Sequence, residues 1–107
     1  MSPIRFEPQP DGKLAAWIAP NGDRVLLRLA GECLARDLGA EAYERFVALD
    51  RIYWDFAVGG DRLTLLWDQQ LGIAVLSNSA SAQDHELARR VASHLAARLV
   101  GPAPMGP

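Results

Sequence analysis

Two short segments near the start of the chain carry apolar residues in a pattern that suits β-strands. They span residues 14–19 and 24–29 and flank the sequence Pro-Asn-Gly-Asp at positions 20–23. Asn-Gly is the strongest short signal for a hairpin, because both central residues of a type I′ turn need positive φ. With Asn-Gly as the loop, one face is wholly apolar and the other pairs Trp17 with Leu26. The pattern therefore predicts a hairpin over residues 14–29.

Residues 32–49 follow a helical period instead. Leucines at positions 34 and 38 lie one turn apart, and apolar residues at 42, 46 and 49 continue at spacings of four and three. Gly39 lies between the two stripes, and the pattern leaves open whether it breaks the helix. We therefore expect one helix over residues 32–49, with or without a break.

Three further segments predict a meander of antiparallel strands, over residues 51–58, 62–68 and 71–77. With Gly59-Gly60 as the first loop, Tyr53 faces Leu66 and Arg51 faces Asp68 as a cross-strand ion pair.

The face that the third strand presents depends on the length of the turn after Asp68. A two-residue loop of Gln69-Gln70 places Ile73 and Val75 beside Tyr53 and Leu66. A shift of one residue replaces that pair by Ala74 and Leu76, because side chains alternate between the faces of a strand.

The last segment has the clearest helical signature in the chain. Leu87, Val91, Leu95 and Leu99 repeat every four residues, with alanines beside them. Ser81 is a candidate N-cap with Asp84 in the capping-box position. Gly-Pro at 101–102 ends the pattern.

The order hairpin, helix, three-stranded meander, helix predicts an α+β fold. We expect an antiparallel sheet of about five strands with two helices packed on one face. Residues 14–100 form the single domain. Residues 1–13 are expected to be an extended N-terminal segment or edge strand, and the Pro- and Gly-rich residues 101–107 a disordered tail.

Composition limits the functional classes. The chain has 107 residues, room for one domain. Eleven basic and 13 acidic residues give a formal charge of −2, which argues against a domain that binds nucleic acid by charge alone. A lone cysteine excludes an internal disulfide. The first residues show no signal-peptide pattern, and no apolar run approaches the 18 residues of a membrane span. We expect a cytoplasmic protein, and its arginine- and alanine-rich composition suggests a bacterial source.

The candidate chemistry is sparse. His85 and His94 are nine residues apart on one helix and point to opposite sides, so they cannot share a metal ion. Cys33 is interpreted as a small core residue. Neither a metal site nor a cofactor is expected.

Three weaker ligand signals remain. Asp55 lies mid-strand on the face of Tyr53, where a carboxylate and an aromatic ring could line a pocket. The loop that contains Ser79 and Ser81 precedes a helix and could hold an anion. Arg89, Arg90 and Arg98 form part of a basic stripe on the last helix that could meet nucleic acid phosphates, although nucleic acid is not the favoured partner.

The strongest expectation concerns the sheet face that the helices leave uncovered. In the predicted registers it carries Trp17, Leu26, Tyr53 and Leu66, with charged residues at its rim. Such a mixture is typical of interaction patches. The residues before position 14 could equally fold over this face. The sequence favours a non-enzymatic interaction or regulatory protein that binds itself, as a homodimer, or another protein. The alternatives are a small enzyme or ligand-binding domain that uses Asp55 and Tyr53, and a nucleic-acid accessory protein.

Overall fold

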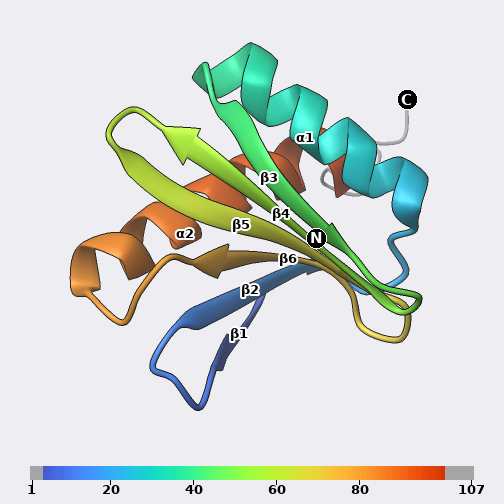
Figure 1. Ribbon diagram of the computed structural model, residues 1–107, viewed down its shortest axis with the longest axis horizontal. Helices are drawn as coiled ribbons and strands as arrows, with labels where there is room; N and C mark the ends of the chain where they lie inside the picture. The colour runs from blue at the N-terminus through green and yellow to red at the C-terminus, as the bar shows by residue number, and fades with distance from the viewer. Residues whose placement is uncertain (1–3, 101–107) are drawn as a thin grey trace, which may run out of the picture.

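A six-stranded antiparallel sheet carries both helices on one of its faces (Figure 1). The structure is a computed structural model and describes residues 4–100. The strands are β1 (Arg5–Pro8), β2 (Leu14–Ala19), β3 (Glu41–Val47), β4 (Arg51–Val58), β5 (Asp61–Asp68) and β6 (Gly72–Ser77). The helices are α1 (Arg24–Leu38) and α2 (Ala82–Leu95), and a π-helical turn over Ala96–Val100 follows α2. The order across the sheet is β1-β2-β6-β5-β4-β3. The α+β class is confirmed, with one strand more than the five or so expected.

The predicted hairpin over residues 14–29 is wrong in its second half. Residues 24–29 begin α1, and neither Asn21 nor Gly22 has the positive φ that a type I′ turn needs. Asp23 is instead the N-cap, and its Oδ1 accepts a hydrogen bond from the Leu26 amide at 2.9 Å. Leu26 therefore lies on a helix and does not face Trp17 across the sheet.

The helix predicted over residues 32–49 is correct only as far as Leu38. Gly39 has φ +64°, a left-handed conformation that suits glycine at a helix C-terminus, and the Ala40 amide donates to the Leu34 carbonyl. Residues 41–47 then form β3, which among the described strands pairs with β4 alone and lies at the edge of the sheet. Gly39 therefore ends the helix, which answers the question that the sequence pattern left open.

The meander has the predicted first register. Tyr53 pairs with Leu66, and Arg51 pairs with Asp68 through a contact of 2.7 Å between Nε and Oδ2. The turn after Asp68 contains three residues instead of two, because Asp68 Oδ1 accepts hydrogen bonds from the amides of Gln70 and Leu71. Residue 72 therefore pairs with Asp68, which is the one-residue shift left open by the sequence.

The core fills the space between the sheet and the two helices. Ser81 caps α2 as predicted, since its Oγ accepts a hydrogen bond from the Asp84 amide at 3.1 Å. The helices contribute Leu27, Ala30, Leu34, Leu87, Val91 and Leu95, and the sheet contributes Phe56, Leu63, Leu65, Ile73 and Val75. The result is a single compact α+β domain. Within residues 4–100, no helix is both long and apolar enough to cross a membrane. Residues 101–107, predicted to be a disordered tail, lie outside the described residues.

Candidate functional site

The helix-free face of the sheet, opposite α1 and α2, carries a continuous row of apolar residues. Successive strand pairings align Trp17, Ala74, Leu66, Tyr53 and Phe46 across five strands, from β2 to β3. Ala74 and Leu76 occupy this face in place of Ile73 and Val75. The prediction that Trp17, Tyr53 and Leu66 share one sheet face is therefore correct. The prediction that Leu26 lies with them is wrong, because Leu26 is on α1.

Exposure along this row is uneven. Trp17 and Leu66 are each only 5% exposed within the single chain. The guanidinium of Arg5, the neighbour of Trp17 on β1, lies 5.7 Å from the centre of its ring. Phe46, at the other end of the row, is 63% exposed. Two of the predicted interaction anchors are therefore largely covered already, and the accessible part of the row lies toward β3.

Next to this row, the helix-free face is hollowed. The depression, which we term the sheet hollow, has a volume of about 530 Å³. Its lining comes from the β1–β2 loop and from β4, β5 and β6: Gln9, Pro10, Asp11, Lys13, Arg51, Tyr53, Asp55, Thr64, Leu66 and Leu76. Small-molecule sites in proteins usually have volumes of about 300–1,000 Å³. The sheet hollow falls within this range and contains both residues of the predicted Asp55–Tyr53 pocket.

Hydrogen bonds hold the polar groups of β4 in place at this hollow. Arg51 donates through Nη1 to the Tyr53 hydroxyl at 3.0 Å and through Nε to Asp68. Thr64 Oγ1 donates to Asp55 Oδ1 at 2.6 Å from the neighbouring strand. Because these side chains are held by partners on the same or the neighbouring strand, their polar atoms are already positioned before any ligand arrives.

Three charged side chains that line the sheet hollow still have atoms available to a ligand. Asp55 Oδ2, Asp11 Oδ2 and Lys13 Nζ form no hydrogen bond or ion pair with any residue in the range 4–100. Asp55 is on β4 and Lys13 directly precedes β2, so two strands, β5 and β6, lie between their strands. The hollow thus has the Asp55 carboxylate on one side of an apolar floor of Leu66 and Leu76, and the Lys13 ammonium group, with Asp11 beside it, on the other.

The predicted anion site at Ser79 and Ser81 is occupied by the protein's own carboxylate. Ser79 Oγ donates to Asp84 Oδ2, and Ser81 Oγ accepts from the Asp84 amide. A helix N-terminus can bind an external anion through free amide groups. Here Asp84 already supplies the negative charge, so these serines serve to begin α2.

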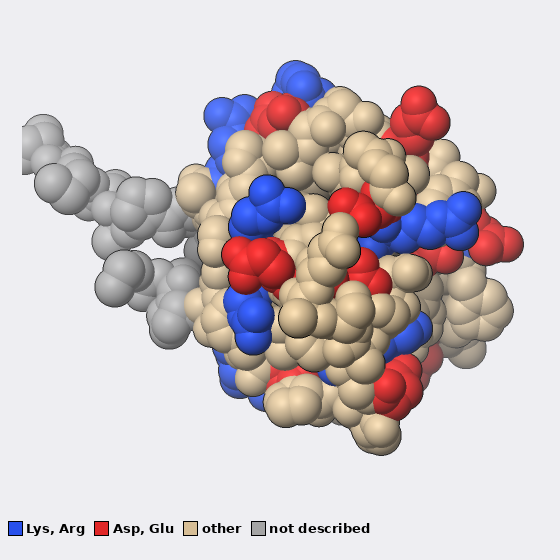
Figure 2. All heavy atoms as spheres, turned by 90° about the vertical axis from the view of Figure 1, so that its left-hand side faces the viewer, with Lys and Arg blue, Asp and Glu red and all other residues tan. Residues whose placement is uncertain are grey.

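The three arginines proposed for nucleic acid do not act as one stripe. Arg98 Nε lies 3.1 Å from Asp37 Oδ2, and Arg89 Nη1 lies 3.9 Å from Glu86 Oε2. Arg90 lines a different, smaller hollow beside His94. Figure 2 shows positive and negative side chains interspersed over the end of the molecule where the β4–β5 turn and the start of α2 lie. This arrangement differs from the one-signed surface that phosphate binding requires.

A second hollow, of about 330 Å³, opens between α1 and the β3–β4 edge on the helix-covered face. Its basic residues include Arg24 and Arg45, which lie over the rings of Trp67 and Trp54 at 4.9 Å and 5.5 Å from the ring centres. Cation–π contacts of this kind cover aromatic rings at the surface. These arginines thus have a structural role that explains their position.

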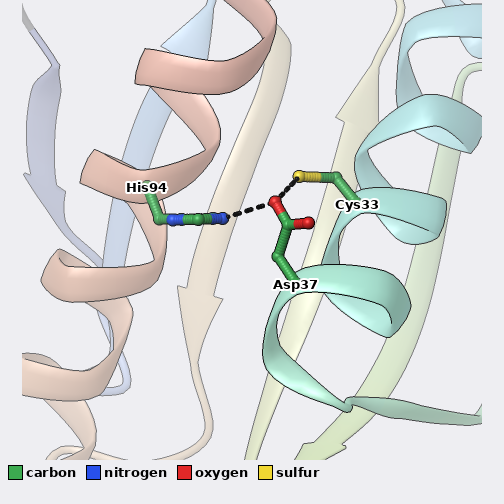
Figure 3. A group of neighbouring side chains, drawn as sticks. All are labelled: Cys33, Asp37 and His94. Atoms are coloured by element: carbon green, nitrogen blue, oxygen red, sulfur yellow. Dashed lines mark hydrogen bonds and ion pairs between the residues drawn. The ribbon is translucent and has the colours of Figure 1, made fainter.

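A polar cluster that the sequence analysis missed joins α1 to α2 (Figure 3). Cys33 Sγ donates to Asp37 Oδ2 at 3.1 Å, and His94 Nε2 lies 2.8 Å from the same oxygen. Cys33 and Asp37 are one helical turn apart, so both point from the same side of α1. Within its own helix His94 has no metal-binding partner, and its contact with Asp37 on the other helix is not visible from the sequence. The four-residue spacing of Cys33 and Asp37 is the one feature of this cluster that the sequence displays.

The protonation states of this cluster follow from its contacts. Burial raises the pKa of the Cys33 thiol, and its hydrogen bond to Asp37 raises it further. The hydrogen bonds that Asp37 accepts from Cys33 and His94 lower the pKa of its carboxyl group. Cys33 is therefore a thiol at neutral pH rather than a reactive thiolate. The arrangement does not suit nucleophilic catalysis, but a thiol, a carboxylate and an imidazole are all potential metal ligands.

Comparison with protein-family models, with curated proteins and with solved structures found no match to this chain.

Proposed function

We propose that the protein binds a small zwitterionic molecule in the sheet hollow. One observation carries this proposal: a hollow of about 530 Å³ has a carboxylate oxygen and an ammonium group available on opposite sides of an apolar floor. A cationic group of the ligand would pair with Asp55 and an anionic group with Lys13. The apolar centre of the ligand would contact Leu66 and Leu76.

The spacing of the two charges indicates the size of the ligand. Neighbouring strands are about 4.8 Å apart, so β2 and β4 are separated by roughly 14 Å. The two side chains shorten this span when they extend over the floor of the hollow. The remaining gap suits an apolar amino acid or a dipeptide better than a larger metabolite. The ring of Tyr53, held by its hydrogen bond from Arg51, offers a further apolar contact.

Nuclear magnetic resonance titration of the full chain tests this proposal. Leucine and leucyl-leucine are suitable probes, and N-acetyl-leucine amide is the uncharged control. We expect saturable shifts at the amides of Tyr53, Asp55 and Leu76 with a zwitterionic probe but not with the control. Asp55→Asn should weaken binding about tenfold or more, because it removes a charge-assisted contact. Asp61→Asn removes a carboxylate that does not line the hollow and should have no effect.

The opposite results are equally clear. If neither zwitterion produces saturable shifts up to tens of millimolar, the proposed ligand class is wrong. Shifts that map outside the sheet hollow, or that are equal for the uncharged control, would also contradict the proposal.

Self-association through the helix-free face is the second candidate, and exposed aromatic residues favour it. Phe46 is 63% exposed and Tyr43 46% exposed, and both lie on β3, whose outer edge has no pairing strand within residues 4–100. An edge strand with exposed apolar side chains is a ready site for pairing with a second chain. A second copy that docks at β3 would cover both rings. Light scattering on a sizing column over a wide range of protein concentration tests this candidate.

A further inference from the structure

The ligand atoms of Cys33, Asp37 and His94 are gathered at one point between the two helices (Figure 3). The thiol sulfur, one carboxylate oxygen and Nε2 all lie within 4.8 Å of one another. Cys33 is 2% exposed, whereas His94 is partly exposed, so the group reaches from the core to the surface. This cluster is separate from the sheet hollow, which lies on the opposite face of the sheet.

Distances within the cluster are close to those that a tetrahedral zinc ion needs. Zn²⁺ binds sulfur at about 2.3 Å and nitrogen or oxygen at about 2.0–2.1 Å, which keeps its ligand atoms about 3.3–3.6 Å apart. The sulfur and the oxygen are 3.1 Å apart, and the nitrogen and the oxygen 2.8 Å. The sulfur and the nitrogen lie within 4.8 Å of each other, so side-chain rotations would have to bring these two atoms to zinc-binding distance.

The donor set also indicates which metal would bind. Thiolate, imidazole and carboxylate together suit Zn²⁺ and exclude the hard, oxygen-seeking ions Mg²⁺ and Ca²⁺. Three protein ligands leave a fourth position open for water or another small ligand. A hollow of about 120 Å³ adjoins His94, and its other lining residues are Leu38, Val58, Leu87, Arg90 and Val91.

The backbone that follows His94 departs from regular α-helical geometry. The turn over Ala96–Val100 is π-helical and begins two residues after His94. Such turns are rare and frequently occur at functional sites. This turn carries Arg98, whose Nε is 3.1 Å from Asp37 Oδ2 and whose side chain is 53% exposed. Because Arg98 is largely in solvent, its guanidinium can move aside when a cation replaces it.

We propose that Cys33, Asp37 and His94 bind one Zn²⁺ ion with an open fourth position. Binding displaces the thiol proton of Cys33 to solvent. The Nε2 proton that His94 donates to Asp37 must leave as well, so the bound neutral imidazole carries its one proton on Nδ1. The ion then takes the place of the two hydrogen bonds that Asp37 Oδ2 accepts from Cys33 and His94. Arg98 competes with the ion for this oxygen in the metal-free protein.

Cobalt substitution in the full chain gives a direct test. Protein stripped of metal with a chelator is titrated with Co²⁺ and then with Zn²⁺. We expect one Co²⁺ per chain, visible bands of tetrahedral cobalt, and a near-ultraviolet thiolate-to-cobalt band that zinc abolishes. A purely structural hydrogen-bond network would not produce these bands. A wild-type chain that shows no stoichiometric uptake, or uptake without the thiolate band, overturns the proposal.

Variants identify the ligands. His94→Ala should abolish the bands, whereas His85→Ala is the matched control, because His85 contacts the Gly12 carbonyl at 2.9 Å and lies away from the cluster. Cys33→Ser should remove the thiolate band. Its folding is checked by circular dichroism, and His94→Ala gives an independent result if the buried serine disrupts the fold. Equal losses in His94→Ala and His85→Ala would overturn the proposal.

In contrast to the ligand variants, Arg98→Gln should strengthen metal binding. Removal of a positive charge beside Asp37 Oδ2 should tighten Zn²⁺ binding, measured against a competing chelator, by roughly tenfold. Arg89→Gln, on α2 and paired with Glu86 rather than with Asp37, is the control for loss of an arginine. Unchanged or weaker binding in Arg98→Gln would place the ion away from Asp37 and overturn the proposal.

Discussion

The two faces of the sheet protect their apolar residues by different means. On the helix-covered face, Phe56, Leu63, Leu65, Ile73 and Val75 are at most 1% exposed, because α1 and α2 lie over them. On the helix-free face, exposure rises along one row from 5% at Trp17 to 63% at Phe46. The first face is a sealed core. The second is covered from β2 through β6 to Leu66 on β5, and it opens toward the β3 edge.

This difference shows how a short chain can combine stability with an accessible surface. Burial against two helices removes the full apolar area of a side chain from water, at about 25 cal/mol per Å². The helix-free face contributes less per residue, because it keeps polar neighbours such as Thr64 and Asp55 beside its apolar row. Substitutions on the two faces should therefore separate loss of stability from loss of binding.

The largest contrast is expected between two adjacent leucines of β5. Leu65 points into the helix-covered core and is 0% exposed, whereas Leu66 lies on the helix-free face. Leu65→Ala should lower the free energy of unfolding by about 3–5 kcal/mol, because the surrounding core cannot collapse into the cavity. Leu66→Ala should lower it by about 2 kcal/mol, the low end for such changes, because Leu66, although only 5% exposed, borders the sheet hollow and water can enter the space that the side chain leaves. Urea unfolding followed by fluorescence measures both, and equal losses would contradict the contrast between the faces.

A helix glycine gives the next test of the covered face. A Cβ on Gly31 would lie 2.3 Å from Trp54 Cζ3, so α1 approaches the sheet more closely there than alanine permits. Alanine gains about 1 kcal/mol of helix propensity, but overpacking typically costs 1–3 kcal/mol. We expect Gly31→Ala to be destabilising by about 1–2 kcal/mol in thermal or urea unfolding. In a Trp54→Leu background the same change should be neutral or stabilising, and an equal loss in both backgrounds would show that Trp54 is not the obstacle.

Low pH should lower the stability of the fold through Asp68, which lies on the helix-free face of the sheet. Burial of this carboxyl opposes ionisation, but hydrogen bonds from the amides of Gln70 and Leu71 and from Arg51 outweigh it and lower the pKa. A lowered pKa in the folded state stabilises the fold above the ordinary pKa of about 3.9. That contribution is lost as the pH falls below 3.9 and through the folded-state pKa.

Asp68→Asn should therefore reduce stability at pH 7, by about 1 kcal/mol, and flatten the loss of stability below pH 4. The measurement is urea unfolding at a series of pH values. Asp61→Asn, at the other end of β5, is the matched variant. If Asp68→Asn keeps the full acid dependence of the wild type, another group is responsible for it.

The sequence predicts the meander of β4, β5 and β6 better than it predicts the segments before it, for a physical reason. The meander depends on contacts between neighbours along the chain, and a Gly-Gly turn and alternating residues fix them locally. Residues 24–29 are apolar enough to fit either period. The Asn-Gly signal favoured a strand, but the cap supplied by Asp23 and burial of Leu27 against the sheet decided for a helix.

The candidate sites were harder to predict, because both join distant segments. Asp55 and Tyr53 were found from their shared strand face, but the hollow beside them also depends on the β1–β2 loop with Lys13. The pair Cys33 and Asp37 can be recognised once residues 24–38 are known to be helical. Its contact with His94 follows from how α1 and α2 lie on the sheet, and no local pattern records that packing.

The smallest effect on stability, and the sharpest test of the open edge, comes from β3. Phe46 and Val47 are neighbours on this strand, 63% and 54% exposed, and point to the helix-free and the helix-covered face respectively. Phe46→Ser and Val47→Ser should each change the free energy of unfolding by no more than about 0.5 kcal/mol, as exposed substitutions usually do. If copies of the chain associate through the helix-free face, light scattering should show that Phe46→Ser weakens the dimer and Val47→Ser does not. Equal weakening would assign association to the strand edge rather than to that face, and a wild-type monomer at every concentration would exclude self-association and leave the face to a ligand.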